Sequence, residues 1–304
     1  MHDASHGRDH LTVIAGTGYV GERMAHARPS LSLVRTHERA AELHARGLES
    51  VVWDFDAGLP DRALSARIAG APIVYLAPPP DGGTTDRRLA GFLAALGELR
   101  PGVLVYISTT GVYGDAGGGD VSVQTPPAPR TVRAKRRLDA ENCVRQWCSK
   151  RGVRWVILRV PGIYGPGRLP IERLRRGDPV VRVEEAGPGN RIHVDDLIAT
   201  CSAALERDVT GVFNVGDGDH ASGTEFLLTL ARLTGLPAPP QIAFADARAR
   251  LSPGMLSFLE ESRRVDTRAM RATLGVVPRH ATHESGLRAA LAQEAAAVRD
   301  GTVS

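Results

Sequence analysis

The sequence has few cysteines and few aromatic residues. Its three cysteines, at positions 143, 148 and 201, are odd in number and lack CxxC or CxxH spacing, so they indicate neither a disulfide framework nor a zinc site. We therefore expect a reducing, cytoplasmic setting and no metal. The chain has only 3 Trp, 5 Tyr and 6 Phe, and none is interleaved with a basic run, which argues against a platform for stacking nucleic-acid bases.

Long hydrophobic runs and a strong charge of one sign are also missing. The apolar run LTVIAG, after the polar start MHDASHGRDH, is far too short for a secretory core or a membrane span. His2, His6 and His10 recur at four-residue intervals in this start, where a flexible polar tail is favoured over a metal trap. A net charge of +4 fits a protein that handles small anionic molecules. We expect a small-molecule substrate and allow for a homodimer, without nucleic-acid or membrane partners.

Short apolar runs alternate with helix-period segments through the first half of the chain. This pattern predicts an α/β protein with a doubly wound parallel sheet, the Rossmann fold. The expected strands are LTVIAG, LSLVRT, SVVWDF, PIVYLAP, VLVYIST and RWVILRV, and GVFNVG is expected to return as a further strand. Residues 222–225 read as a capping box for a later helix, which Gly235 ends.

A glycine-rich turn follows the first expected strand. Gly16, Gly18 and Gly21 have GxGxxG spacing between this strand and a helix, the context in which backbone groups approach a pyrophosphate. The second strand ends in Arg35, with Arg39 one turn further on. An arginine here suits the extra phosphate of NADP, whereas NAD favours a carboxylate. We therefore expect NADP rather than NAD, with a solvated surface arginine as the alternative.

Six segments together resemble the extended short-chain dehydrogenase/reductase family, which contains NAD(P)-dependent epimerases and dehydratases. They are GTGYVG, YISTTGVYGD, LRVPGIYGPGR, RIHVDDLIAT, VFNVGDG and ESRRVDTRAMRATLG. The resemblance implies an NADP-binding Rossmann domain at 1–165 and a smaller, interleaved substrate region at 166–304, with about 193–216 returning to the first domain. The residues expected to contact the cofactor are Gly16, Gly18, Tyr19, Val20, Gly21, Arg35, Thr36, Arg39, Asp54, Phe55, Ala77, Pro78, Ser108, Lys135, Pro161, Gly162 and Ile163.

The resemblance also implies a catalytic set built on a Ser or Thr and a YxxxK motif. Thr109 takes the Ser/Thr position and Lys135 takes the lysine position. The tyrosine position falls on Thr131, whose hydroxyl is far less acidic than a phenol. The sequence thus resembles atypical members that lack this tyrosine, and a helix N-cap is the alternative role for Thr131.

Other residues are candidates for the missing acid or for substrate binding. Tyr113 and Tyr164 lie in segments that the family places near the cofactor. His193 has a pKa range suited to proton transfer, with a structural histidine as the favoured alternative. Arg168 and Arg191 are candidates to clamp an anionic substrate. We expect an NADP-dependent oxidoreductase acting on a small polar metabolite. The alternatives are a non-catalytic NADP-binding sensor or scaffold and a nucleotide-sugar epimerase or dehydratase.

Overall fold

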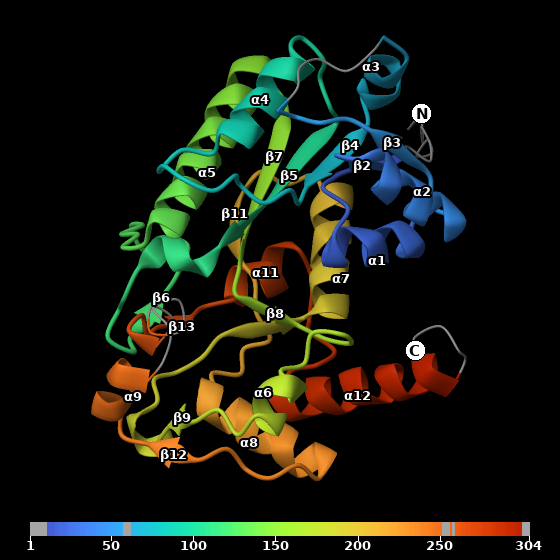
Figure 1. Cartoon of the computed structure of the whole chain (residues 1–304). Helices are drawn as coiled ribbons and strands as arrows, with labels where there is room; N and C mark the ends of the chain where they lie inside the picture. Colours follow the sequence, from blue (N-terminus) through green and yellow to red (C-terminus); the bar gives the residue numbers. More distant parts are fainter. Residues whose placement is uncertain (1–10, 57–61, 251–255, 257–258, 300–304) are drawn as a thin grey trace. The chain divides into compact units, whose positions relative to one another are not determined.

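The computed structural model describes residues 11–56, 62–250, 256 and 259–299 (Figure 1). Contacts divide the chain into two compact units, the first made of residues 1–108, 135–158 and 201–212, and the second of residues 109–134, 159–200 and 213–304. This division differs from the expected boundary at residue 165. The segment 109–134 belongs to the second unit because its strand β6 (Asp120–Val121) pairs with β13 (Arg264–Val265).

A mostly parallel seven-stranded sheet organises the fold, as the sequence predicts. Its order is β11-β7-β5-β4-β1-β2-β3. The strands are β1 (Thr12–Ala15), β2 (Ser30–Val34), β3 (Ser50–Val52), β4 (Pro72–Tyr75), β5 (Val103–Thr109), β7 (Arg154–Val160) and β11 (Gly211–Asn214). The associated helices are α1 (Tyr19–Ala27), α2 (His37–Ala45), α3 (Arg62–Ile68), α4 (Arg87–Leu96), α5 (Val132–Arg151) and α7 (Val194–Glu206). The expected strands all form, including the returning GVFNVG segment.

Burial of apolar side chains explains why these segments adopt these elements. The strands β1 and β2 are buried along their whole length, as expected for the interior of a parallel sheet. Helix α4 buries Leu89, Phe92, Leu93 and Leu96, at the spacing of one helical face. These side chains join an aromatic cluster in the first unit, where the ring centroids of Phe55 and Phe92 are 4.9 Å apart.

The second unit contains shorter elements around a separate core. Its helices are η1 (Thr110–Tyr113), α6 (Ile171–Arg175), η2 (Val183–Glu185), α8 (Gly223–Thr234), α9 (Phe244–Arg250), α11 (Arg268–Thr273) and α12 (His283–Arg299). Its remaining strands are β8 (Gly162–Tyr164), β9 (Val180–Val181), β10 (Arg191–His193) and β12 (Gln241–Ile242), which pair as β8 with β10 and β9 with β12. The capping box of Ser222 and Glu225 forms on α8, and Gly235 ends that helix with φ 69°.

Within the described residues, we find no helix with the length and apolar character that crossing a membrane requires.

Candidate functional site

The glycine turn between β1 and α1 has a shape that requires glycine at two of its three positions. Gly16 has φ 98°, and a Cβ atom there would lie 2.4 Å from the backbone nitrogen of Ala77. A Cβ atom on Gly21 would lie 2.9 Å from the carbonyl oxygen of Gly16. Both glycines therefore let the chain pack closely against itself, which is what the tight turn of a dinucleotide-binding loop needs.

The middle glycine, Gly18, faces open space. It is exposed, and a Cβ atom on it would have no heavy atom within 4 Å. Gly18 is also the N-cap of α1, and no side chain caps that end of the helix. No side chain therefore caps the first N–H groups of α1, and no side chain covers the backbone at Gly18. A pyrophosphate can bind at such a helix N-terminus.

The two arginines expected at the ribose phosphate differ in their surroundings. Arg39 is held by ion pairs with Glu22 at 2.6 Å and Glu42 at 2.7 Å, and it donates to the carbonyl of Thr17. Arg35 is exposed and forms no ion pair within the described part of the chain. Arg35 is therefore the arginine of this pair that can turn to an added phosphate, whereas Arg39 must first leave Glu22.

Other expected cofactor residues in the first unit have structural contacts of their own. Phe55 is buried in the aromatic cluster, and Asp54 accepts a hydrogen bond from the backbone of Asp56 at 3.0 Å. The carbonyl of Pro78 accepts a hydrogen bond from Arg88 at 2.7 Å.

Two expected cofactor residues with hydroxyl groups are also engaged. Ser108 is buried and donates to the Glu141 carboxylate at 2.6 Å. Thr36 caps α2 by accepting the N–H of Arg39. These side chains, and the backbone carbonyl of Pro78, are thus partly committed to the fold.

The second unit contains a cavity of about 660 Å³ that is rich in arginine, and we call it the arginine cavity. It brings together Thr109, Thr131, Pro161 and Gly162 from the expected site. Its charged lining residues are Arg133, Arg173, Arg191, Arg263 and Glu261. The cations outnumber the single carboxylate, so the cavity suits an anionic ligand.

Three of these arginines are held in place by the fold. Arg191 donates to the carbonyl of Ala221 at 2.6 Å, and burial lowers the pKa of its guanidinium. Arg263 is buried and pairs with Glu261 at 3.1 Å. Arg173 donates to the carbonyl of Pro179 at 3.2 Å, while its buried Nε has no hydrogen-bond partner in the described residues. The guanidinium groups are thus pre-positioned, which lowers the entropic cost of gripping an anion.

Sequence reasoning missed Arg133 and Arg173 and did not assign a role to Arg263. Arg168, which it did name, is exposed and is absent from the lining of the arginine cavity. The four lining arginines lie far apart in the sequence and share no spacing. Arg191, which the sequence names as a candidate anion clamp, does line the cavity, and the ESRRVD segment is the signal that could have pointed to Arg263.

The hydroxyls of Thr109 and Thr131 line the arginine cavity in different roles. Thr109 Oγ1 accepts the N–H of Gly111 at 3.1 Å, which leaves its own proton available to a substrate oxygen. Thr131 Oγ1 accepts the N–H of Ala134 at 3.2 Å, immediately before α5 begins. Thr131 therefore has the geometry of a helix N-cap, the alternative role considered from the sequence. Lys135 follows in the first turn of α5 and is exposed.

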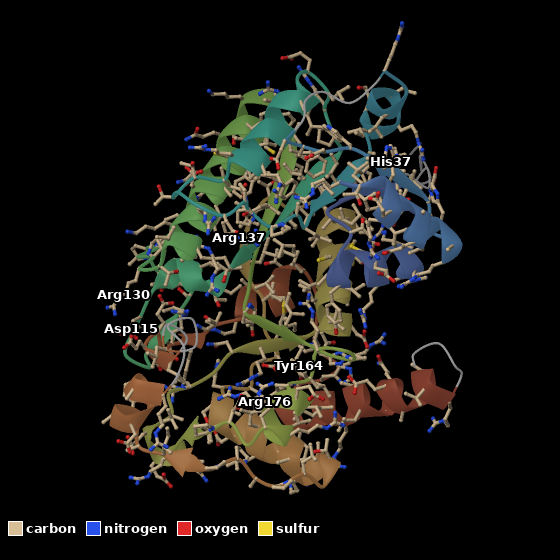
Figure 2. The ribbon with its side chains drawn as sticks, in the orientation of Figure 1. His37, Asp115, Arg130, Arg137, Tyr164 and Arg176 are labelled. Atoms are coloured by element: carbon tan, nitrogen blue, oxygen red, sulfur yellow. The ribbon has the colours of Figure 1, made fainter. Side chains whose placement is uncertain are left out.

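The candidate proton donors are all buried. Tyr113 is 3% exposed, and its hydroxyl donates to Asn214 Oδ1 at 2.6 Å. Tyr164 (Figure 2) is 4% exposed, and burial raises the pKa of its phenol well above the usual value. His193 is fully buried, with its ring 5.3 Å from that of Tyr164. None of these side chains lines the arginine cavity, so the geometry does not favour them as acids.

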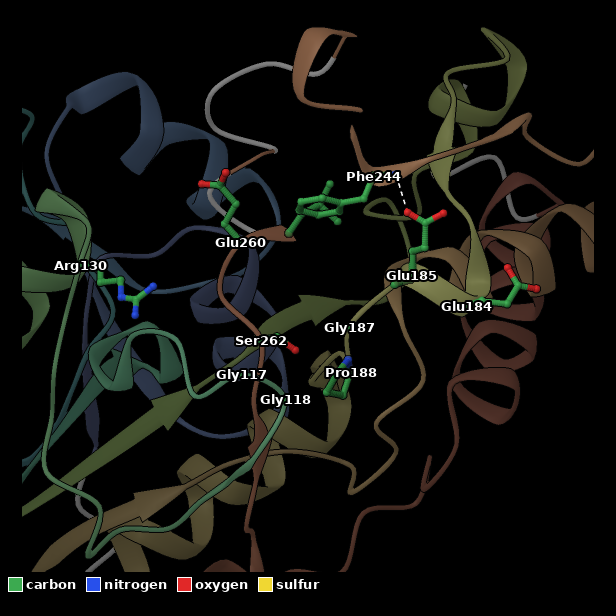
Figure 3. Close-up of a pocket in the computed structure, with 12 residues that line it drawn as sticks. Gly117, Gly118, Arg130, Glu184, Glu185, Gly187, Pro188, Phe244, Glu260 and Ser262 are labelled. Carbon is green, nitrogen blue, oxygen red and sulfur yellow. Dashed lines mark hydrogen bonds between the residues drawn. The ribbon is translucent and has the colours of Figure 1, made fainter. Parts of the chain in front are cut away.

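A second cavity of about 750 Å³ in the same unit has a different character (Figure 3). Glu184, Glu185 and Glu260 line it together with Arg130 and the ring of Phe244. Glu185 accepts the backbone N–H of Phe244 at 2.8 Å, as the dashed line in Figure 3 marks. The two cavities share the 186–188 segment, Leu259 and Ser262, so the glutamate-rich lining adjoins the arginine cavity.

Residues 87–216 match the model of the NAD dependent epimerase/dehydratase family, in agreement with the resemblance that the sequence motifs indicate. Among curated proteins, the chain is 29% identical over 176 residues to the 3-diazoavenalumate denitrifying reductase of a Streptomyces species, covering 55% of each chain. It is 30% identical over 161 residues to protein YeeZ of Escherichia coli K12, covering 53% of this chain and 54% of YeeZ. The chain thus spans about half the length of these relatives.

Solved structures extend the similarity over nearly the whole chain. A conserved protein of unknown function from Silicibacter pomeroyi is 28% identical with a TM-score of 0.78, covering 93% of this chain and 98% of that one. UDP-glucuronic acid 4-epimerase from Bacillus cereus, solved with NAD, is 18% identical with a TM-score of 0.73, covering 94% and 99%. MoeE5, solved with UDP-glucose and NAD, is 19% identical with a TM-score of 0.73, covering 95% and 99%. The last two show the fold.

Proposed function

We propose that the protein is a reductase that uses NADPH and acts on a small anionic metabolite. The observation that carries this proposal is the glycine turn, in which Gly16 and Gly21 pack against the chain while Gly18 and the uncapped start of α1 stay open. The exposed Arg35 supports NADP as the dinucleotide, although two of the solved structures named above, MoeE5 and the Bacillus cereus epimerase, hold NAD.

The arginine cavity supports the assignment of an anionic substrate. Arg173, Arg191 and Arg263 bind a carboxylate or phosphate on the substrate, and the Thr109 hydroxyl donates a hydrogen bond to the substrate oxygen without giving up its proton. A reduced nicotinamide supplies a hydride when bound. Thr109 stabilises the negative charge that develops on the oxygen. Since Thr131 caps α5 and is far less acidic than a phenol, the proton comes from solvent or from the substrate.

A nucleotide-sugar epimerase or dehydratase is the second candidate. It is favoured by the similarity to the sugar-nucleotide enzymes and by the four arginines, which suit a diphosphate. Such reactions begin by removing a proton and a hydride from an alcohol. Thr131 weakens this candidate, because a threonine hydroxyl that caps a helix is a poor base.

The first test measures NADPH consumption with small carboxylated or phosphorylated ketones and imines, and product formation from UDP-sugars in parallel. We expect consumption with one of the anionic substrates. Thr109→Val removes one oxyanion donor and should lower the rate by about a hundredfold to a thousandfold. Ser122→Ala is the control, because its hydroxyl bonds Gln124 at 2.9 Å and does not line the arginine cavity.

Each result separates the candidate functions. A full rate in Thr109→Val would contradict the role of Thr109, provided that NADPH affinity is unchanged. Conversion of a UDP-sugar without net NADPH loss would instead establish the epimerase or dehydratase. NADPH binding without any turnover would favour the sensor.

A further inference from the structure

Two histidines and an aspartate gather at the end of β10 in the second unit. His193 is the last residue of β10, Asp195 lies in the first turn of α7, and His280 lies in the loop between α11 and α12. One ligand atom from each lies within 4.8 Å of the other two. Two imidazole nitrogens and a carboxylate oxygen are donors that Zn²⁺ prefers. We propose that this His193–Asp195–His280 cluster binds a divalent transition metal, best matched by Zn²⁺.

The Nδ1 atom of His193 lies next to both the backbone and the carboxylate of Asp195. Its Nδ1 accepts the backbone N–H of Asp195 at 3.3 Å and lies 3.6 Å from Asp195 Oδ2. An Nδ1 atom that accepts a hydrogen bond carries no proton, which is the form of imidazole that binds a metal, and a metal at Nδ1 takes the place of this long hydrogen bond. The ring is fully buried, so its position is fixed by the surrounding core.

His280 is anchored through its backbone. The buried Asp196 carboxylate accepts the N–H of Arg279 at 2.8 Å and the N–H of His280 at 3.1 Å. This contact places the His280 ring 4.2 Å from the His193 ring, measured between centroids. In the described part of the chain, neither ring nitrogen of His280 forms a hydrogen bond. The ring is therefore held nearby without being committed to another protein group.

Asp195 accepts a supporting hydrogen bond from a neighbouring side chain, as carboxylates that bind metals commonly do. Its Oδ2 accepts from the amide of Gln293 on α12 at 3.1 Å, and its side chain is 37% exposed. Around tetrahedral zinc, with bonds of about 2.0 to 2.2 Å, two ligand atoms lie about 3.3 Å apart. Movements of about 1 Å by the half-exposed Asp195 and His280 achieve this spacing. Water takes the fourth position.

The metal joins segments that are distant in the sequence. It ties the loop before α12 to the end of β10 and the start of α7, beside the anchor that Asp196 already provides. Its role is to fix the C-terminal helices of the second unit. The sequence does not predict this site, because the cysteine spacing shows no zinc motif and His280 lies far from the RIHVDD segment.

The test is calorimetric titration of the chelator-treated full chain with Zn²⁺. Because His2, His6 and His10 can also bind a metal, the measurement is repeated in a variant with all three changed to Ala. We expect one Zn²⁺ per chain in that background. His280→Ala and Asp195→Asn should each weaken binding by at least about tenfold, since even outer contacts change affinity by that factor. His220→Ala, a half-buried histidine bonded to Asn190, should leave it unchanged.

A thermal melt gives the second readout. Zn²⁺ should raise the Tm of the background protein but not that of His280→Ala, because a ligand stabilises the state that binds it. Binding that disappears with the tail histidines, or that survives His280→Ala at full affinity, overturns the proposal. Neither readout uses a nicotinamide cofactor, so this result is independent of the proposed reductase function.

Discussion

The Asp217 carboxyl group shows how a single residue makes stability depend on pH. It is 2% exposed, and burial is the main reason why its pKa is raised from 3.8 to about 7. Because the folded protein holds this proton more tightly than the unfolded chain, the group stabilises the fold below pH 3.8, and this contribution is lost as the pH rises towards 7. The loss is at most about 4 kcal/mol.

Asp217→Asn tests this prediction, since the amide resembles the protonated acid and does not titrate. Urea unfolding at pH 5 and pH 8 should show the wild type losing more stability than Asp217→Asn over that interval. Asp246→Asn, an exposed change on α9, is the control and should follow the wild type. Parallel curves for the wild type and Asp217→Asn would show that Asp217 is already ionised at pH 5.

Thr131 is the residue at which the proposed chemistry departs from that of the family. Its hydroxyl accepts the N–H of Ala134, as Ser, Thr, Asp and Asn do at helix N-caps. A tyrosine at this position provides no such cap. One residue thus favours the start of α5 over acid–base chemistry, which is why we infer a reductase that obtains its proton elsewhere.

At the scale of elements, the contact between α12 and β8 depends on one glycine. A Cβ atom on Gly286 would lie 1.9 Å from the hydroxyl oxygen of Tyr164, within the core cluster that contains Phe226 and Leu287. Gly286→Ala gains about 1 kcal/mol of helix propensity. Overpacking typically costs about 1 to 3 kcal/mol, so we expect a net loss of stability.

Thermal unfolding with two further variants isolates this contact. Gly223→Ala on α8 is the matched control, because a Cβ there meets only the flexible end of Arg191 at 3.9 Å. It should leave Tm unchanged or raise it. Tyr164→Phe removes the hydroxyl and should recover part of the loss when combined with Gly286→Ala. A Gly286→Ala variant as stable as the wild type would show that α12 shifts without cost.

At the scale of the whole molecule, the sequence predicts the sheet better than the second unit. Strands such as β5 and β7 are seven residues long and mostly apolar and buried, and the Ser222 capping box is a local pattern. The pairs β8 with β10 and β6 with β13 involve two or three residues that are distant in the sequence. Such pairing depends on tertiary contacts, which local patterns do not encode.

The same distinction applies to the candidate site. The glycine turn and Arg35 follow from local spacing after a strand, so the sequence predicts them. The arginine cavity gathers Arg133, Arg173, Arg191 and Arg263 from four separate segments. The engagement of Arg39 by Glu22 also depends on the packing of α2 near α1. The sequence names Arg191 as a candidate anion clamp, but only the fold brings it together with the other three arginines, so no pattern in the sequence predicts the cavity.

The proposed reductase function depends most directly on NADPH binding, which calorimetric titration of the wild-type chain and Arg35→Ala measures. We predict one NADPH per chain, bound more tightly than NADH. In Arg35→Ala this preference should fall by about tenfold to a hundredfold, as expected for a charged hydrogen bond of roughly 1.5 to 3 kcal/mol. Arg67→Ala, which removes an ion pair with Glu49, is the control. Equal affinities for NADPH and NADH, unchanged in Arg35→Ala, would contradict the NADP assignment, and no binding of either would contradict the central claim.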